Sequence, residues 1–200
     1  MLNAMKIDAD RAMLLVIDFQ TKLLPQIHEN RSVLTAAGQL LHGAKMFSLP
    51  IVATEQYRRG LGPTHAYVAE LFPTYGVKVL EKMTFSCCCD DAVRNCLNEV
   101  DRPQVIVTGI EAHVCVAQTV LDLLAMEYQV FVCADAVGSR KPRDYEFAIA
   151  RMRDCGATIT TAEALLFELC HVSGTSEFKQ LLDLVKDPTQ GREFSIPSSA

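Results

Sequence analysis

Three side chains with complementary chemistry follow predicted strands of this chain: Asp18, Lys82 and Cys115. A cysteine thiolate can attack a carbonyl or imine carbon, and a carboxylate can take up the thiol proton and return it to a leaving group. A lysine ammonium can hold both negative charges in place. This set predicts a nucleophilic centre, with a small apolar packing role for Cys115 as the alternative.

The stretch that would position Cys115 is QVIVTGIEAHVCVAQT, residues 104–119. Residues 104–108 are rich in β-branched side chains and predict a buried strand. Apolar residues then recur at helical spacing, which predicts a helix over 112–126. Cys115 would lie in or just before the first turn of that helix, where the positive end of the helix dipole is expected to lower the thiol pKa.

Short apolar runs and helical patterns alternate along the whole chain. Strands are predicted at 12–17, 51–54, 77–80, 104–108, 129–133 and 157–160, and helices at 33–47, 66–71, 91–99, 112–126, 142–154, 161–169 and 176–186. Ser32, Asp90 and Pro142 suit helix starts, and Gly156 suits a helix end. The alternation predicts an α/β fold with a mostly parallel sheet. Because parallel strands end at one edge, Asp18, Lys82 and Cys115 can converge there.

The composition suits a single domain over residues 1–200, with a core over about 10–187 and a C-terminal extension at 188–200. Hydrophobic residues make up 50% of the 200 residues, and the net charge is -5. That charge disfavours nucleic acid and anionic membrane surfaces as partners. No apolar run is long enough for a membrane helix, and the N-terminus lacks the apolar core of a signal peptide.

The predicted compartment is therefore the cytoplasm, with a mitochondrial location as the alternative. In a reducing compartment the eight cysteines are expected to be free thiols. The absence of a CxxC pair makes a structural zinc site improbable. The contiguous triple at 87–89 is expected to form a buried turn, with redox sensitivity or a place close to the pocket as its alternatives.

Three motifs resemble those of the isochorismatase-like cysteine hydrolases: VIDFQ at 16–20, EKMTFS at 81–86 and GIEAHVCVAQT at 109–119. Two further segments, TEQYRRGLGPT at 54–64 and ADAVGSR at 134–140, resemble the small eukaryotic isochorismatase-domain proteins in particular. The resemblance covers about residues 10–187. It implies a Rossmann-like, three-layer α/β/α fold with a six-stranded parallel sheet and helices on both faces.

The resemblance also implies roles for individual residues. Asp18, Lys82 and Cys115 would form the catalytic triad, and a non-proline cis peptide between Ile110 and Glu111 would aim the amides of Glu111 and Cys115 as an oxyanion hole. Nicotinamide-hydrolysing members carry Asp and His metal ligands after the second strand. Here that region is ATEQYRR, without histidine, so neither a metal nor a cofactor is expected. Relatives form dimers or larger assemblies, which predicts a homo-oligomer.

Four other polar and aromatic residues are candidates for the substrate-binding part of the site. Phe19, Gln20, Tyr57 and Phe85 are predicted to contact the substrate, although a core or solvated position would explain each of them. A Cys115–His113 dyad is not expected, because residues two apart on a helix do not face each other. Asp135, with Ser139 and Arg140, either supports the site or caps a loop at the end of the fifth predicted strand.

The leading hypothesis is a metal-independent cysteine hydrolase that acts on a small amide-type or related molecule through a thioester. One alternative is a non-catalytic binding or assembly protein on the same scaffold. A second alternative is a ribonuclease. The net charge of -5 and the preference of thiolates for acyl carbon over phosphate argue against it.

Overall fold

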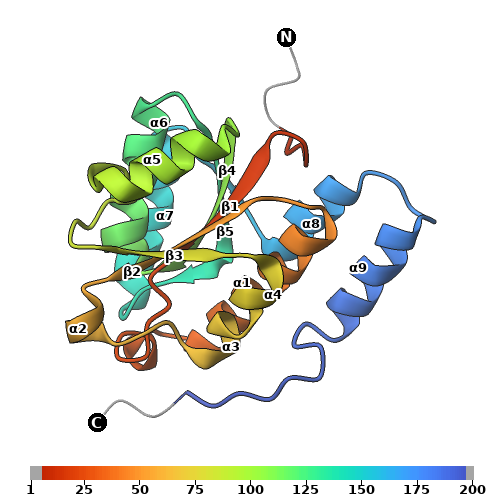
Figure 1. Ribbon diagram of the computed structural model, residues 1–200, viewed down its shortest axis with the longest axis horizontal. Coiled ribbons are helices and arrows are strands. Elements are labelled where there is room, and N and C mark those ends of the chain that lie inside the picture. The colour runs from red at the N-terminus through yellow and green to blue at the C-terminus, as the bar shows by residue number, and fades with distance from the viewer. Residues whose placement is uncertain (1–5, 197–200) are drawn as a thin grey trace.

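The computed structural model describes residues 6–196, and its centre is one six-stranded sheet (Figure 1). The strands are β1 (Ala12–Ile17), β2 (Ile51–Gln56), β3 (Lys78–Lys82), β4 (Gln104–Ile110), β5 (Gln129–Gly138) and β6 (Thr158–Thr160). Their order is β3-β2-β1-β4-β5-β6, and every neighbouring pair is parallel. The predicted α/β class with a six-stranded parallel sheet is confirmed.

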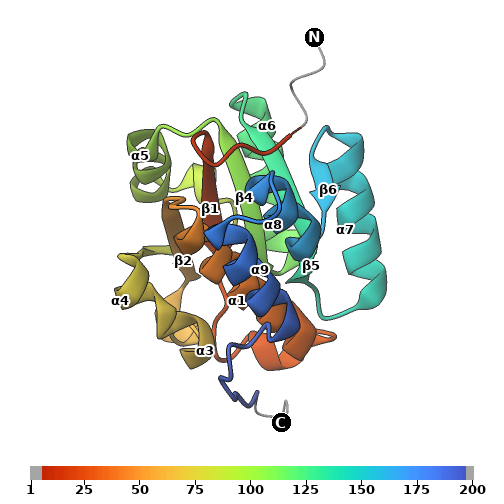
Figure 2. The same cartoon turned by 90° about the vertical axis from the view of Figure 1, so that its right-hand side faces the viewer.

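Helices cover both faces of the sheet (Figures 1 and 2). One face carries α1 (Asn30–Met46), α3 (Ala66–Ala69), α4 (Leu71–Tyr75), α8 (Ala162–Cys170) and α9 (Ser176–Lys186), and the other carries α5 (Asp91–Val100), α6 (Ala117–Ala125) and α7 (Pro142–Asp154). A short helix, α2 (Arg58–Leu61), follows β2. Two 3-10 turns (Leu24–Gln26 and Cys87–Cys89) and a π-helical turn (Ala112–Val116) complete the set. No helix within residues 6–196 is long and apolar enough to cross a membrane.

The central strand β1 separates two apolar cores. Leu14 and Val16 belong to the core under α1 and α8, whereas Met13, Leu15 and Ile17 belong to the core under α5, α6 and α7. Side chains alternate across a strand, so a strand with cores on both sides must be apolar at every position. This explains the uninterrupted run AMLLVI, which is buried throughout.

Most predicted helix ends agree with the structure. The Asp90 carboxylate caps α5 by accepting from the amides of Ala92 and Val93. Pro142 opens α7, and Gly156, at a φ of 109°, follows its end. The predicted start of α1 is wrong, because the chain enters the helix through Glu29 in the left-handed region. The helix therefore begins at Asn30, and Ser32 lies inside the first turn instead of capping it.

Four strands run further toward the carboxyl edge than their apolar runs predict. Parallel pairing continues through polar residues, so Gln56 pairs with Lys82 and Ile110 pairs with Gly138. The prediction that Asp135 ends a strand is therefore wrong. It lies inside β5, and its carboxylate accepts from the amide of Ala162 at 2.9 Å.

The sheet changes winding direction between β1 and β4. The chain runs outward from β1 to β3 and then returns to place β4 beside β1, and such a switch point is where open α/β sheets place ligands. Gly109 permits this approach. A Cβ at Gly109 would lie 2.4 Å from the carbonyl oxygen of Ile17, and its φ of 147° favours glycine. The turns that follow β1 and β4 are thereby held close together.

Candidate active site

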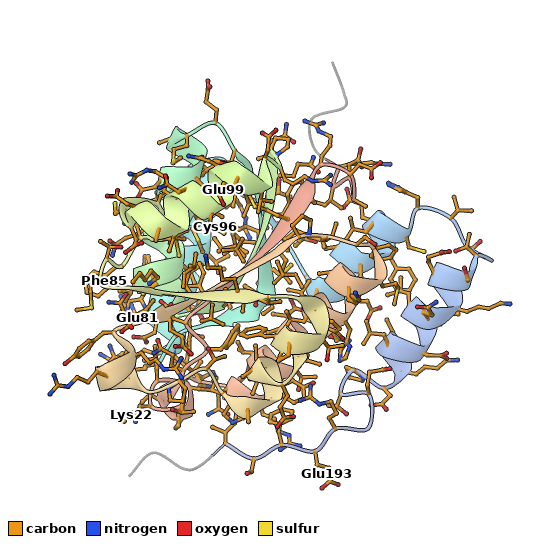
Figure 3. All side chains as sticks on the ribbon, in the orientation of Figure 1. Lys22, Glu81, Phe85, Cys96, Glu99 and Glu193 are labelled. Atoms are coloured by element: carbon orange, nitrogen blue, oxygen red, sulfur yellow. The ribbon has the colours of Figure 1, made fainter. Side chains whose placement is uncertain are left out.

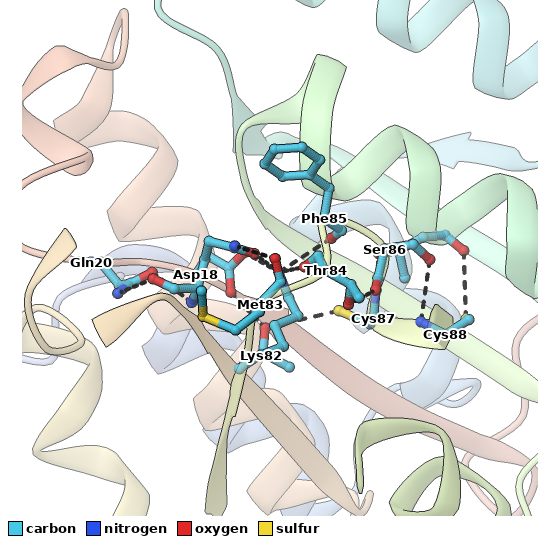
Figure 4. Close-up of polar contacts among 12 residues, drawn as sticks. Asp18, Gln20, Lys82, Met83, Thr84, Phe85, Ser86, Cys87 and Cys88 are labelled. Atoms are coloured by element: carbon cyan, nitrogen blue, oxygen red, sulfur yellow. Dashed lines mark hydrogen bonds and ion pairs between the residues drawn. The ribbon is translucent and has the colours of Figure 1, made fainter. Parts of the chain in front are cut away.

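A buried ion pair lies at the carboxyl edge of the sheet. Lys82 Nζ is 2.7 Å from Asp18 Oδ2, and neither side chain is exposed to solvent (Figure 4). The other carboxylate oxygen, Asp18 Oδ1, accepts from the Thr54 hydroxyl at 2.8 Å. Asp18 follows β1 with a φ of 55°, a left-handed conformation that turns the chain out of the strand.

Lys82 is fixed by its place in the sheet. It is the last residue of β3, paired with Gln56 of β2, and its ammonium donates to Gln56 Oε1 at 2.9 Å. It also donates to the carbonyls of Thr84 and Phe85. Burial is the largest single effect on the pKa of Lys82 and lowers it. The charge of Asp18, the hydrogen bond to it and the nearby thiols of Cys87 and Cys115 together outweigh burial, so the pKa lies above its ordinary value. Lys82 therefore remains a cation inside the protein.

Cys115 lies in the π-helical turn between β4 and α6, with 5% of its surface exposed. Burial raises the pKa of its thiol, and the negative charge of the adjacent Asp18 carboxylate raises it further. Lys82 acts in the opposite direction. The expectation that the helix N-terminus lowers this pKa is wrong, because burial and the adjacent carboxylate dominate. At neutral pH Cys115 is a thiol.

The peptide bond between Ile110 and Glu111 is cis, at the point where β4 meets the turn that carries Cys115. The buried Glu111 carboxylate accepts from the backbone amide of Arg140 at 3.1 Å and from its Nε at 3.0 Å. His113 Nδ1 lies 3.0 Å from the Ser139 hydroxyl. The segment after β5 thus holds the start of this turn.

The four predicted substrate contacts do not gather in one place. Phe19 is part of the core. Gln20 is fully buried, and its side chain bonds only backbone groups: its amide donates to the carbonyls of Gln56 and Gly62, and its Oε1 accepts from the Gln56 amide. Tyr57 and Phe85 are exposed, and the Phe85 ring points away from Asp18 and Lys82 (Figures 3 and 4). Their contact with a substrate stays a prediction.

Comparison with known proteins identifies the family. The family model of the isochorismatase domain matches residues 12–164, which span β1 to α8. The chain belongs to the isochorismatase family.

Relatives of this isochorismatase-family chain span nearly its whole length. It is 36% identical over 178 residues to isochorismatase domain-containing protein 2 of Danio rerio, with 89% of this chain and 88% of the relative covered. It is 38% identical over 181 residues to the Homo sapiens protein of the same name, with 88% and 84% covered. A solved structure described as the MAR1 ribonuclease of Caenorhabditis elegans superposes with a TM-score of 0.82 at 33% identity, covering 96% and 95% of the two chains.

The end of β2 is occupied by internal contacts in this isochorismatase-family member. The Glu55 carboxylate accepts from Arg58 at 2.7 Å and from the amide of Thr64 at 2.6 Å. Among residues 6–196, no group of three His, Cys, Asp or Glu side chains is arranged to hold a metal ion.

Two further residues lie near the ion pair: Thr54, which the sequence analysis missed, and Cys87, for which a place near the site was one alternative. Thr54 is a hydrogen-bond partner of Asp18, and the buried Cys87 thiol lies 3.9 Å from the Thr54 hydroxyl. Burial raises the pKa of Cys87 to about 11. Thr54 ends an apolar run at the same sheet edge as Asp18, and this placement is the signal that could have found it. Cys87 lies in a triple of identical residues, so nothing in its residue type distinguishes it from its neighbours.

Proposed function

We propose that this protein is a metal-independent cysteine hydrolase of a small amide-type or related substrate. Cys115 is the nucleophile, Asp18 moves protons, and Lys82 keeps the carboxylate charged. The observation that carries the proposal is the buried Asp18–Lys82 pair, whose two opposite charges both act on the buried Cys115 thiol. A carboxylate and a thiol held in this way are a general base beside a nucleophile.

The proposed reaction has two halves. The Cys115 sulfur attacks the acyl carbon while its proton passes to Asp18, and the amides of Glu111 and Cys115 donate hydrogen bonds to the developing oxyanion. Asp18 then gives the proton to the leaving amine, the carbon–nitrogen bond breaks, and a thioester forms. In the second half Asp18 takes a proton from water, and the hydroxide attacks the thioester. The carbon–sulfur bond breaks, and the proton returns to the sulfur as the acid leaves.

The raised pKa of Cys115 fits a nucleophile that is activated only when a substrate is present. A resting thiol resists stray electrophiles, whereas proton transfer to an adjacent carboxylate forms the thiolate during the attack. Lys82 stabilises the thiolate as it forms, because its positive charge opposes the effect of Asp18.

The test is acyl-enzyme trapping. The purified protein is mixed with a panel of small primary amides and activated esters, and intact mass is measured after rapid acid quenching. We expect an acyl adduct on Cys115 in the wild type and none in Cys115→Ala, with Cys96→Ala as the matched control that retains the adduct. Turnover that survives Cys115→Ala in folded protein would refute the mechanism.

A second candidate is ribonuclease activity, because the Caenorhabditis elegans structure is described as a ribonuclease and is 33% identical to this chain. The net charge of -5 counts against an RNA substrate. Pure protein incubated with single-stranded RNA should leave the RNA intact. Cleavage that disappears in both Cys115→Ala and Asp18→Asn would put this candidate first. A folded protein that neither acylates nor cleaves would favour the non-catalytic alternative.

We also propose a homo-oligomer. Exposed apolar side chains support it, since Met83, Phe85 and Phe147 are each more than half exposed. Sedimentation velocity at micromolar concentration should give a mass of two chains or more. A single domain over residues 1–200 and a cytoplasmic location stay predictions.

A further inference from the structure

The outer side of α7 carries several charges that have no partner within the molecule. This helix lies at one edge of the molecule, next to the edge strand β6 (Figure 2). Five of its charged residues are exposed and form no ion pair within residues 6–196: Arg143, Glu146, Arg151, Arg153 and Asp154. Phe147, which is 65% exposed, lies among them. A single exposed aromatic residue is ordinary, so the arrangement of the charges around it is the informative feature.

One stripe of residues runs along the side of α7 that points away from the core. Ala148, Ile149 and Met152 are the buried residues of this helix. On the opposite side, residues spaced by four, three and four positions lie within about 60° of one another around the helix axis. The exposed residues at this spacing are Arg143, Phe147, Ala150 and Asp154. The Arg143 guanidinium carbon is 5.8 Å from the centroid of the Phe147 ring, so neighbours in the stripe lie side by side.

The two ends of this stripe carry charges that the helix itself does not favour. Arg143 is in the first turn of α7, and Asp154 is its last residue. The partial positive charge at the start of a helix favours acidic side chains, and the partial negative charge at its end favours basic ones. The helix dipole therefore does not explain either residue. A partner surface with the opposite charges at the matching places would explain both.

A second copy of α7 has such a surface when it packs antiparallel to the first. A two-fold axis that passes between Phe147 and Ala150 sets Arg143 opposite Asp154 of the partner subunit. The same axis sets Phe147 over the partner's Ala150, whose small side chain leaves room for the ring. In a two-fold contact each interaction occurs twice, so the surface is complementary to itself.

The residues on either side of the stripe also fit this arrangement. Glu146 and Arg153 lie on one flank, and Asp144 and Arg151 lie on the other. In the antiparallel pair each flank meets its own copy in reverse. Glu146 then faces the partner's Arg153, and Asp144 faces the partner's Arg151. Every facing pair is of opposite charge, whereas a parallel pair would set each charge beside its own copy and bring like charges together.

We propose that α7 packs antiparallel on α7 of a second copy of this chain, with Arg143 paired to the partner's Asp154 and Phe147 at the centre. This inference rests on the homo-oligomer proposed above and adds the surface through which it forms. A contact between single helices buries less than about 1,200 Å², so we expect a dissociation constant in the micromolar range that increases with salt. Asp144 lies 3.9 Å from His113, so the surface adjoins the turn that carries Cys115.

The test is sedimentation velocity on dilution series of the full chain and its charge variants. Arg143→Glu brings two acidic side chains together across the axis, and Asp154→Arg brings two basic ones together. At low ionic strength, each should raise the dissociation constant at least about tenfold. The double variant restores opposite charges and should return it to within about threefold of the wild type. Lys179→Glu makes the same change in charge on the exposed side of α9 and should have no effect.

Both single substitutions give the ends of α7 the charges that its dipole favours, so the variants should fold, and circular dichroism checks this. A wild-type oligomer that neither single variant weakens would overturn the α7 contact and leave the proposed homo-oligomer intact. A double variant that associates no more tightly than the single variants would also overturn it. A wild type that sediments as one chain would refute both. The measurement needs no substrate, so it does not depend on the proposed catalysis.

Discussion

Asp18 has two effects on Cys115 that act in opposite directions during a reaction. Before substrate arrives, its negative charge helps to keep the proton on sulfur. During attack, the same carboxylate is the nearest acceptor for that proton. Asp18 should therefore lower the reactivity of the resting thiol toward simple electrophiles while it promotes acyl-enzyme formation. The two reactions can be measured separately.

We predict that Asp18→Asn makes Cys115 more reactive toward iodoacetamide while it abolishes acyl-enzyme formation. Without the carboxylate, Lys82 remains to lower the pKa of the thiol, so a larger fraction is thiolate at pH 8. The measurement is the rate of Cys115 alkylation between pH 7 and 10, read by peptide mass spectrometry. In the wild type the rate should still be rising above pH 9. A wild-type rate that levels off below pH 8 would contradict the raised pKa.

Lys82 should matter for stability as well as for chemistry. Replacement by Met leaves the Asp18 carboxylate buried without its counter-charge, and breaking one partner of a buried pair typically costs about 3–5 kcal/mol. We predict a loss of this size for Lys82→Met in urea unfolding. Lys78→Met, at the exposed start of β3, should change stability by less than about 0.5 kcal/mol.

The two partners of the pair should also show coupling. In the double variant Asp18→Asn with Lys82→Met, the loss should be smaller than the sum of the two single losses, because neither charge remains unpaired. Strictly additive losses would mean that the 2.7 Å contact does not stabilise the fold.

At the scale of elements, Gly109 decides how closely β4 approaches β1. We predict that Gly109→Ala destabilises the protein by at least about 3 kcal/mol, because the added methyl group meets the Ile17 backbone at 2.4 Å. Gly156→Ala is the matched control. Gly156 also has a positive φ, of 109°, but nothing lies within 4 Å of a Cβ there, so its loss should be about 1–2 kcal/mol. Equal losses in urea unfolding would show that backbone conformation alone requires glycine at 109.

Which elements the sequence predicts, and which it does not, follows from the physics of strand ends. The apolar runs locate β1 and the starts of β2, β3, β4 and β5, because burial on both faces leaves a clear pattern. The carboxyl ends of these strands are polar, and they continue only because they pair with adjacent strands, as Gln56 does with Lys82. The local sequence does not show which strand lies alongside, so it cannot predict these ends. The helix end alone predicts a lowered pKa for the Cys115 thiol. This prediction is wrong because burial and the charge of Asp18 raise the pKa, and both depend on the tertiary structure.

At the scale of the whole molecule, buried thiols make the folded state sensitive to alkali. Burial raises the pKa of Cys87 to about 11 and that of Cys88 to about 12, and it also raises the pKa of Cys115 and Cys133. Such groups stay protonated in the folded state at a pH where the same thiols in an unfolded chain have lost their protons. These thiols lie in both apolar cores, so the effect belongs to the fold and not to one site.

We therefore predict that stability falls from about pH 9 upward. Below the ordinary thiol pKa of 9.0 both states are protonated and stability is fully present. Between pH 9 and 11 the unfolded chain binds fewer protons than the folded protein, so the free energy of unfolding decreases as pH rises. For Cys87 alone, two pH units at about 1.4 kcal/mol each give a loss of about 3 kcal/mol.

Urea unfolding at pH 8, 9, 10 and 10.5 should show a shallower decline in Cys87→Ala than in the wild type, whereas Cys155→Ala, at an exposed thiol, should follow the wild type. A wild-type stability that stays constant from pH 8 to 10.5 would show that burial does not raise the pKa of these thiols.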